Sequence, residues 1–288
     1  MADSLREAPE PMTHTILISV DIEGVAGVFH PEQTRPGNGE YERARLWMTD
    51  EANAAIAGAF DGGAGAVVVN DSHGSFRNMP AARLDPRARI VQGKPRYLSM
   101  VAGVERPGTT GVCMVGYHAR AHAPGILAHT INSGAFAGIR VNGEWQSEAT
   151  LYGALAGDYG VPVLMASGDD AFIAETAPRL PGTVFVQTKE ASGMNSGVSL
   201  SPEAACAAIR EGVARAVAQA ANARPAPLRV PGPLNVELHT QTPAHADLFC
   251  QWPSFERVDG TVLRFDAPTM EAAVRMLNCC SAMAMMLR

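Results

Sequence analysis

Hydrophobic and polar positions form two kinds of segment that alternate along the first two thirds of the chain. Short apolar runs rich in valine and isoleucine are typical of strands buried on both faces of a sheet. We predict such strands over residues 15–21, 66–70, 89–91, 111–116, 161–166 and 183–188. Segments with apolar residues near helical spacing lie between them, over 41–60, 147–157 and 169–177. The alternation predicts an α/β fold with a largely parallel sheet flanked by helices.

The pattern changes after about residue 200. Ser201-Pro202-Glu203 is typical of a helix start, and an alanine-rich helix is predicted from there to about Asn222. Two proline-rich breaks follow, and beyond them we expect two strands, a loop or short helix between them, and a final helix, near 234–239, 261–266, 244–250 and 269–287.

These patterns divide the chain into three parts. We expect a flexible leader over residues 1–13 and an α/β metal-binding catalytic domain over 14–200. The remaining residues, 201–288, are predicted to form a smaller C-terminal α+β lobe.

Composition narrows the classes of partner. The chain has 288 residues with 23 basic and 29 acidic side chains, and no cluster of lysine and arginine that would neutralise nucleic-acid phosphates. No apolar run reaches membrane-spanning length, and the polar N-terminal segment does not resemble a signal peptide. The five cysteines are odd in number and contain no C-x-x-C pair, which favours reduced thiols in a cytoplasmic protein.

The first candidate for chemistry is a pair of acids, Asp21 and Glu23, at the end of the first predicted strand. Side chains two residues apart on an extended backbone point the same way, so these two carboxylates repel each other. A divalent metal ion would relieve that repulsion. The alternative is that both acids are solvated where the strand meets a loop.

Two histidines follow other predicted strands. His73 comes after the second strand and His118 after the fourth. Carboxyl ends of parallel strands share one edge of a sheet, where ligand sites form, so both should lie near Asp21 and Glu23. Glu148, at the start of the next helix, can join them. Each residue alone has a more ordinary role, but together they favour zinc or a related metal, and two sets sharing one carboxylate would suit a metal pair.

Several motifs occur in a specific order, and together they resemble one family. They are Ser19-Val20-Asp21-Ile22-Glu23-Gly24, Met48-Thr49-Asp50-Glu51-Ala52-Asn53, Asn70-Asp71-Ser72-His73, Gly116-Tyr117-His118-Ala119, Pro124-Gly125 with His129-Thr130, and Val161-Pro162-Val163 with Gly168-Asp169-Asp170. From about residue 15 to the C-terminus, the chain is similar to the D-aminopeptidase family of dinuclear zinc peptidases. The resemblance implies a zinc-dependent aminopeptidase that hydrolyses short peptides, with an N-terminal D-amino acid such as D-alanine.

The resemblance also implies how the ligands are shared between two zinc ions. Asp21 matches the carboxylate that bridges both metals. Glu23 and His118 match ligands of one zinc ion, and His73 and Glu148 match ligands of the other.

His129 matches the histidine that the family assigns to catalysis. The resemblance further implies a homo-oligomer, in the form of a ring-like decamer. Met194 departs from the family pattern, which usually has a basic residue after the glycine at this place. The departure bears on the choice of peptide and leaves the metal ligands unaffected.

Two other functions stay open at this point. A dinuclear phosphoesterase also uses aspartate and histidine at strand ends, but it needs groups that hold phosphate, for which Arg120 is one candidate. A metal-binding oligomer without catalytic activity would bind zinc and turn over no peptide.

Overall fold

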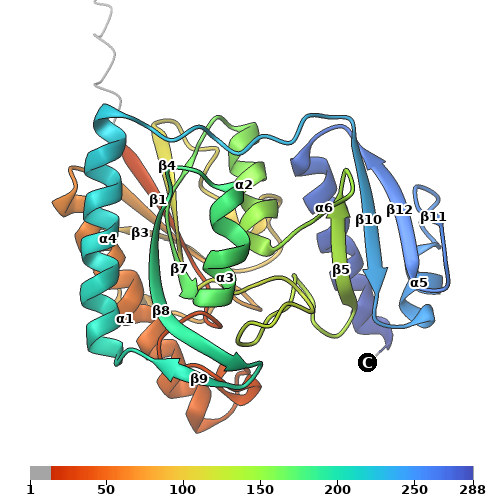
Figure 1. Ribbon diagram of the computed structural model, residues 1–288, viewed down its shortest axis with the longest axis horizontal. Helices are drawn as coiled ribbons and strands as arrows, with labels where there is room; N and C mark the ends of the chain where they lie inside the picture. Colours follow the sequence, from red (N-terminus) through yellow and green to blue (C-terminus); the bar gives the residue numbers. More distant parts are fainter. Residues whose placement is uncertain (1–13, 288) are drawn as a thin grey trace, which may run out of the picture.

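The computed structural model describes residues 14–287, so the leader predicted over 1–13 lies outside the described residues. A seven-stranded sheet fills one half of the molecule, in the order β3-β2-β1-β4-β7-β8-β9 (Figure 1). Every neighbouring pair in it is parallel except β8 with β9. The strands are β1 Thr15–Val20, β2 Ala66–Asp71, β3 Arg89–Val91, β4 Thr109–Val115, β7 Val163–Asp169, β8 Val184–Gly193 and β9 Ser196–Ser199. The predicted α/β class with a largely parallel sheet is confirmed.

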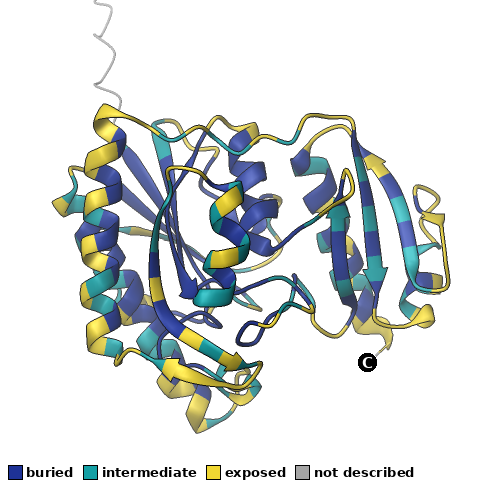
Figure 2. Cartoon of the chain, in the orientation of Figure 1, coloured by how far each residue is buried: buried dark blue, intermediate teal, exposed yellow. Residues whose placement is uncertain are grey.

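Helices cover both faces of this sheet. Helix α1 (Gly39–Asp61) packs against α4 (Pro202–Asn222) on one face, while α2 (Glu148–Asp158) and α3 (Asp170–Thr176) lie on the other (Figure 1). Successive side chains of a strand point to opposite faces. In β1, Ile16 and Ile18 accordingly join the core under α1 and α4, and Leu17 joins the core that contains α2. Figure 2 shows the central strands buried along almost their whole length.

A second, antiparallel sheet lies at the other end of the long axis, in the order β11-β12-β10-β5-β6. Its strands are β5 Phe136–Val141, β6 Glu144–Trp145, β10 Leu234–Thr240, β11 Glu256–Arg257 and β12 Val262–Ala267. It is accompanied by α5 (Pro243–Phe249) and α6 (Met270–Met283). Within residues 14–287, short 3-10 helices lie at Pro31–Thr34, Ala81–Arg83, Ser99–Val101, Ala177–Arg179 and Ala284–Leu287. Sequence analysis predicted β10 and β12 but not β5, whose partner β10 is distant in the sequence.

Residue 200 does not separate the segments of the two sheets. Helix α4 follows that residue yet packs on the parallel sheet, and β5 precedes it yet lies in the antiparallel sheet. One apolar core also joins residues of both sheets, such as Val112 and Val236. The division of the chain at residue 200 stays a prediction. Within residues 14–287, no helix combines the length and apolar character needed to cross a membrane.

Candidate metal centre and active site

The acidic pair directly follows β1. The backbone there is tied to the end of β4, because Asp21 N donates to Val115 O at 2.9 Å and Gly24 N donates to Gly116 O at 2.7 Å. A Cβ atom on Gly24 would lie 2.0 Å from the carbonyl oxygen of Tyr117, so only glycine permits this approach. The tie leaves both Asp21 and Glu23 buried, at 2% and 5% exposure.

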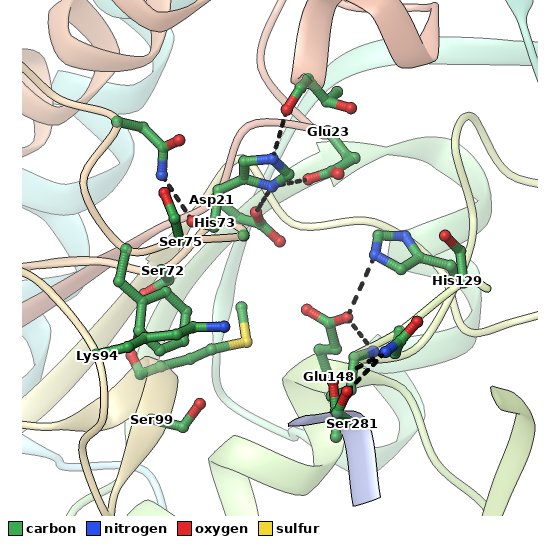
Figure 3. A pocket seen from close by; sticks show the side chains of 18 of the residues that line it. Asp21, Glu23, Ser72, His73, Ser75, Lys94, Ser99, His129, Glu148 and Ser281 are labelled. Carbon is green, nitrogen blue, oxygen red and sulfur yellow. Dashed lines mark hydrogen bonds and ion pairs between the residues drawn. The ribbon is translucent and has the colours of Figure 1, made fainter. Parts of the chain in front are cut away.

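Asp21 lies between the two predicted histidines. Its Oδ1 is 3.3 Å from Nδ1 of His73, and its Oδ2 is 3.4 Å from Nε2 of His118. Nδ1 of His73 is also 3.0 Å from Oε2 of Glu23 (Figure 3). Nε2 of His118 is 3.6 Å from Oε2 of Glu148. The contacts therefore pair Glu23 with His73 and Glu148 with His118, which differs from the division that the family resemblance implies.

Both imidazoles are oriented by backbone carbonyls. Nε2 of His73 lies 2.8 Å from Thr34 O, and Nδ1 of His118 lies 2.9 Å from Ala119 O. A carbonyl oxygen only accepts, so the nitrogen facing it carries the proton. In a neutral ring the other nitrogen then presents its lone pair to the carboxylates, which is the tautomer of a metal ligand with a supporting hydrogen bond.

Mutual contact, rather than burial, decides the protonation of these groups. Burial lowers the pKa of an imidazole, but the charge of Glu23 and the contacts with both acids raise the pKa of His73 well above its usual value. Glu148 and Asp21 raise the pKa of His118 in the same way, against the effect of burial. In return, and again against burial, His73 lowers the pKa of Glu23 and His118 lowers that of Glu148.

The donor set fits zinc. Three carboxylates converge here, and Oε2 of Glu23 and Nε2 of His118 are buried without a hydrogen bond of good geometry. Unsatisfied buried polar atoms are costly unless a ligand contacts them. Carboxylate and imidazole donors suit zinc. Two groups have ligand atoms within 4.8 Å of one another: Asp21 with Glu23 and His73, and His118 with His129 and Glu148.

His129 lies on the loop between β4 and β5. Its ring stacks on that of His118, with centroids 4.2 Å apart, and its Nε2 is 3.7 Å from Oε1 of Glu148. Nδ1 lies 3.0 Å from Leu127 O and so carries the proton, which leaves Nε2 facing Glu148. The loop is braced from β8–β9, because Leu127 N donates to Met194 O at 2.9 Å. The structure thus brings all six predicted site residues together.

Arg120 takes a different place. Its guanidinium pairs with Glu175 at 3.4 Å and stacks over Trp145, and it does not line the pocket beside the acidic cluster. Nothing in this arrangement directs it toward a phosphate at the metal ligands, so the geometry does not favour a phosphoesterase. Asp71 accepts hydrogen bonds from the backbone of Asn78 and Met79 and so fixes the turn after His73.

Two buried residues with ionisable side chains, Lys189 and Glu51, stabilise the backbone of the site. The sequence analysis did not predict this role for either of them. Nζ of Lys189 donates to the carbonyls of Glu23 and Val28, the latter at 2.7 Å. Oε1 of Glu51, on α1, accepts a hydrogen bond at 2.9 Å from the backbone N–H of Ala26, which lies in the same loop as Glu23 and Val28. Both fix the backbone that carries Glu23. The motifs quoted in the sequence include Glu51, but spacing alone assigns neither residue a role.

The cluster opens into a pocket of about 960 Å³, a size in the usual range for small-molecule sites. Figure 3 shows Asp21, Glu23 and His73 on one wall and His129 with Glu148 on another. The pocket is bounded elsewhere by the loop after β2, by residues near Lys94 and by the end of α6.

Known proteins share this sequence and fold. A family model for the D-aminopeptidases, peptidase family M55, matches residues 15–279. The D-aminopeptidase of Bacillus subtilis (strain 168) is 36% identical over 205 residues, which are 70% of this chain and 73% of that protein. The solved Zn-dependent D-aminopeptidase DppA from Bacillus subtilis, described as a self-compartmentalizing protease, superposes with a TM-score of 0.89 at 31% identity, covering 94% of this chain and 98% of that one. The chain belongs to the D-aminopeptidase family of peptidases.

Proposed function

We propose that this protein is a zinc-dependent aminopeptidase that removes an N-terminal D-amino acid, such as D-alanine, from short peptides. The observation that supports it most is the convergence of three carboxylates and two backbone-oriented imidazoles at the base of a pocket. We further propose two zinc ions per chain. Asp21 would contact both, Glu23 and His73 would hold one, and His118 and Glu148 would hold the other.

Bound zinc supplies Lewis acidity, which polarises a peptide carbonyl and lowers the pKa of a water molecule. The chain's own residues do the rest. Asp21, Glu23 and Glu148 would hold the ions, and their position at the wall of the pocket lets a peptide's N-terminal residue lie beside them.

We assign His129 to proton transfer. With Nδ1–H held by Leu127 O, its Nε2 faces the pocket beside Glu148 and can accept a proton from the attacking water. As the C–N bond breaks, the same nitrogen returns that proton to the leaving amine. The stack on His118 and the contact with Glu148 keep the ring in the orientation that both steps need.

We propose a homo-oligomer, in the form of a ring-like decamer, because the related DppA is described as self-compartmentalizing. Exposed apolar side chains on and beside the β8–β9 hairpin support an interface there, with Met194 56% exposed and Val198 66% exposed. A cytoplasmic location is proposed from the five free cysteines.

A turnover screen tests the proposed function. The zinc-loaded protein is assayed with matched dipeptides that differ only in the configuration of the first residue, such as D-Ala-Gly and L-Ala-Gly. We expect hydrolysis of the D-dipeptide, its loss on chelation, and its return on adding zinc. Release of phosphate from nitrophenyl phosphate, or no hydrolysis of any peptide, would contradict the proposal.

A further inference from the structure

Lysine is rare in this chain, and both lysines lie at the site. Of the 23 basic side chains only Lys94 and Lys189 are lysines, and the rest are arginines. Lys189 is buried and donates to backbone carbonyls behind Glu23. Lys94 instead lines the pocket, on the loop that follows β3.

The surroundings of Lys94 leave its ammonium free for a ligand. Nζ lies 4.4 Å from the centroid of the Phe76 ring, and Figure 3 shows it pointing into the cavity that separates it from Glu148 and His129. No carboxylate among residues 14–287 forms an ion pair with it. Lys94 is exposed as a residue, but partial burial of its ammonium and the nearby charge of Arg96 lower the pKa of Lys94, against the charge of Glu148, so an anion bound in the pocket would relieve an unfavourable setting.

The other cation against Phe76 is already committed to the fold. The guanidinium of Arg96 lies 3.8 Å from the Phe76 centroid. Its Nη1 donates to Val91 O at 3.1 Å and its Nη2 donates to Oδ1 of Asn70 at 2.7 Å. Arg96 therefore fixes one side of the aromatic ring, and the ring in turn positions the ammonium of Lys94.

The pocket thus has the proposed metal ligands at one wall and a free ammonium at another. A short peptide whose N-terminal residue lies at the metal ligands ends in a carboxylate, the group that an ammonium binds. We propose that Lys94 determines specificity by binding the C-terminal carboxylate of a short peptide whose N-terminus lies at the acidic cluster. This assignment rests on the proposed aminopeptidase function.

Arg35 is the competing candidate for the same role. Like Lys94, it lines the pocket and has an exposed side chain. Within the described residues it contacts no aromatic ring and forms no ion pair, so nothing fixes its position, whereas Phe76 fixes Lys94. Substitution of Arg35 by glutamine therefore provides a control that removes one positive charge from the same pocket.

The test compares D-Ala-D-Ala with its C-terminal amide, which lacks the carboxylate, on zinc-loaded enzyme. We expect the wild type to prefer the free acid. Lys94→Met should lower kcat/KM for the acid about 10–100-fold, mostly through KM, and leave the amide nearly unchanged, because a charge-assisted contact is lost. Lys94→Arg should restore part of the preference, and Arg35→Gln should keep it.

Several outcomes would overturn the assignment. One is an equal loss on acid and amide in Lys94→Met, which would point to a role in the reaction or in folding. Another is a wild type without preference for the acid, and a third is loss of the preference in Arg35→Gln instead. Hydrolysis of neither substrate by the wild type would overturn the proposed function and this assignment with it. Hydrolysis of both substrates at equal rates would overturn the assignment alone.

Discussion

The site consists of two halves that are built differently and meet at Asp21. The β1–β2 half, Asp21 with Glu23 and His73, comes from strand ends and is braced from behind by Lys189 and Glu51. The β4–α2 half comprises His118, His129 and Glu148, and includes a residue on a long loop. The first half is fixed by the sheet, whereas the second depends on contacts between distant segments, so changes to each should have different consequences.

Removal of Asp21 should disable both halves. Each of its carboxylate oxygens faces one histidine, so Asp21→Ala deletes a ligand from both proposed zinc sites. We expect zinc per chain to fall from two to near zero and peptide hydrolysis to fall below detection, measured by elemental analysis and dipeptide turnover. Asp266→Ala, which removes an exposed carboxylate on β12, is the matched control. Retention of two zinc ions and full rate would refute the assignment.

Removal of His129 should separate catalysis from metal binding. If its Nε2 transfers protons, His129→Ala should lower kcat by about 10²–10⁴ and leave the zinc content unchanged. His122→Asn changes an exposed histidine of the same loop, and asparagine tolerates its φ of 63°, so this variant should keep the wild-type rate. Loss of zinc from His129→Ala would instead make His129 a metal ligand of the β4–α2 half.

Removal of Lys189 should loosen the β1–β2 half alone. Lys189→Met leaves the buried carbonyls of Glu23 and Val28 without their donor, at a cost of about 2–4 kcal/mol in the free energy of unfolding. We also expect the affinity for one of the two proposed zinc ions to fall about 10–100-fold, as for other residues that position ligands. Urea unfolding and zinc titration measure both. The other lysine variant, Lys94→Met, should change stability by less than about 0.5 kcal/mol. Equal stability of the two variants would contradict the bracing role.

Glu51 should give the smallest effect, visible as a pH dependence. Burial raises the pKa of Glu51 to about 7, against the hydrogen bond from Ala26 N and the charge of Lys189. The folded state then binds the proton more tightly than the unfolded state, so the stabilisation is complete below about pH 4.5 and is lost as pH rises through about 7. Glu51→Gln cannot ionise. Relative to it, the wild type should lose about 1–3 kcal/mol of unfolding free energy between pH 4.5 and 8. Parallel pH profiles in urea unfolding would refute this.

The part of the site that lies at the ends of parallel strands could be predicted from the sequence. Apolar runs predict the parallel strands, and the shared carboxyl edge of a parallel sheet predicts that His73 and His118 lie near Asp21. The resemblance supplied His129. Contacts place His73 beside Glu23, which spacing alone does not predict, because both His73 and His118 lie next to Asp21.

Other features depend on contacts that a linear pattern does not encode. Strand β5 pairs with β10, about a hundred residues later in the sequence, and its Gly138 lies against Trp145 of β6. Neither contact follows from the local pattern. Lys189 resembles an ordinary surface lysine in the sequence, yet the fold buries it behind Glu23. The position of the Lys94 ammonium depends on its contact with Phe76, which lies on a different loop, so the sequence alone does not predict it.

Anomalous diffraction from crystals of the zinc-loaded protein tests the central claim most directly, because it counts the metal ions and locates each one. We predict two zinc peaks on either side of Asp21, one contacted by Glu23 and His73 and the other by His118 and Glu148. A single peak, or a peak contacted by Glu23 together with His118, would contradict the account.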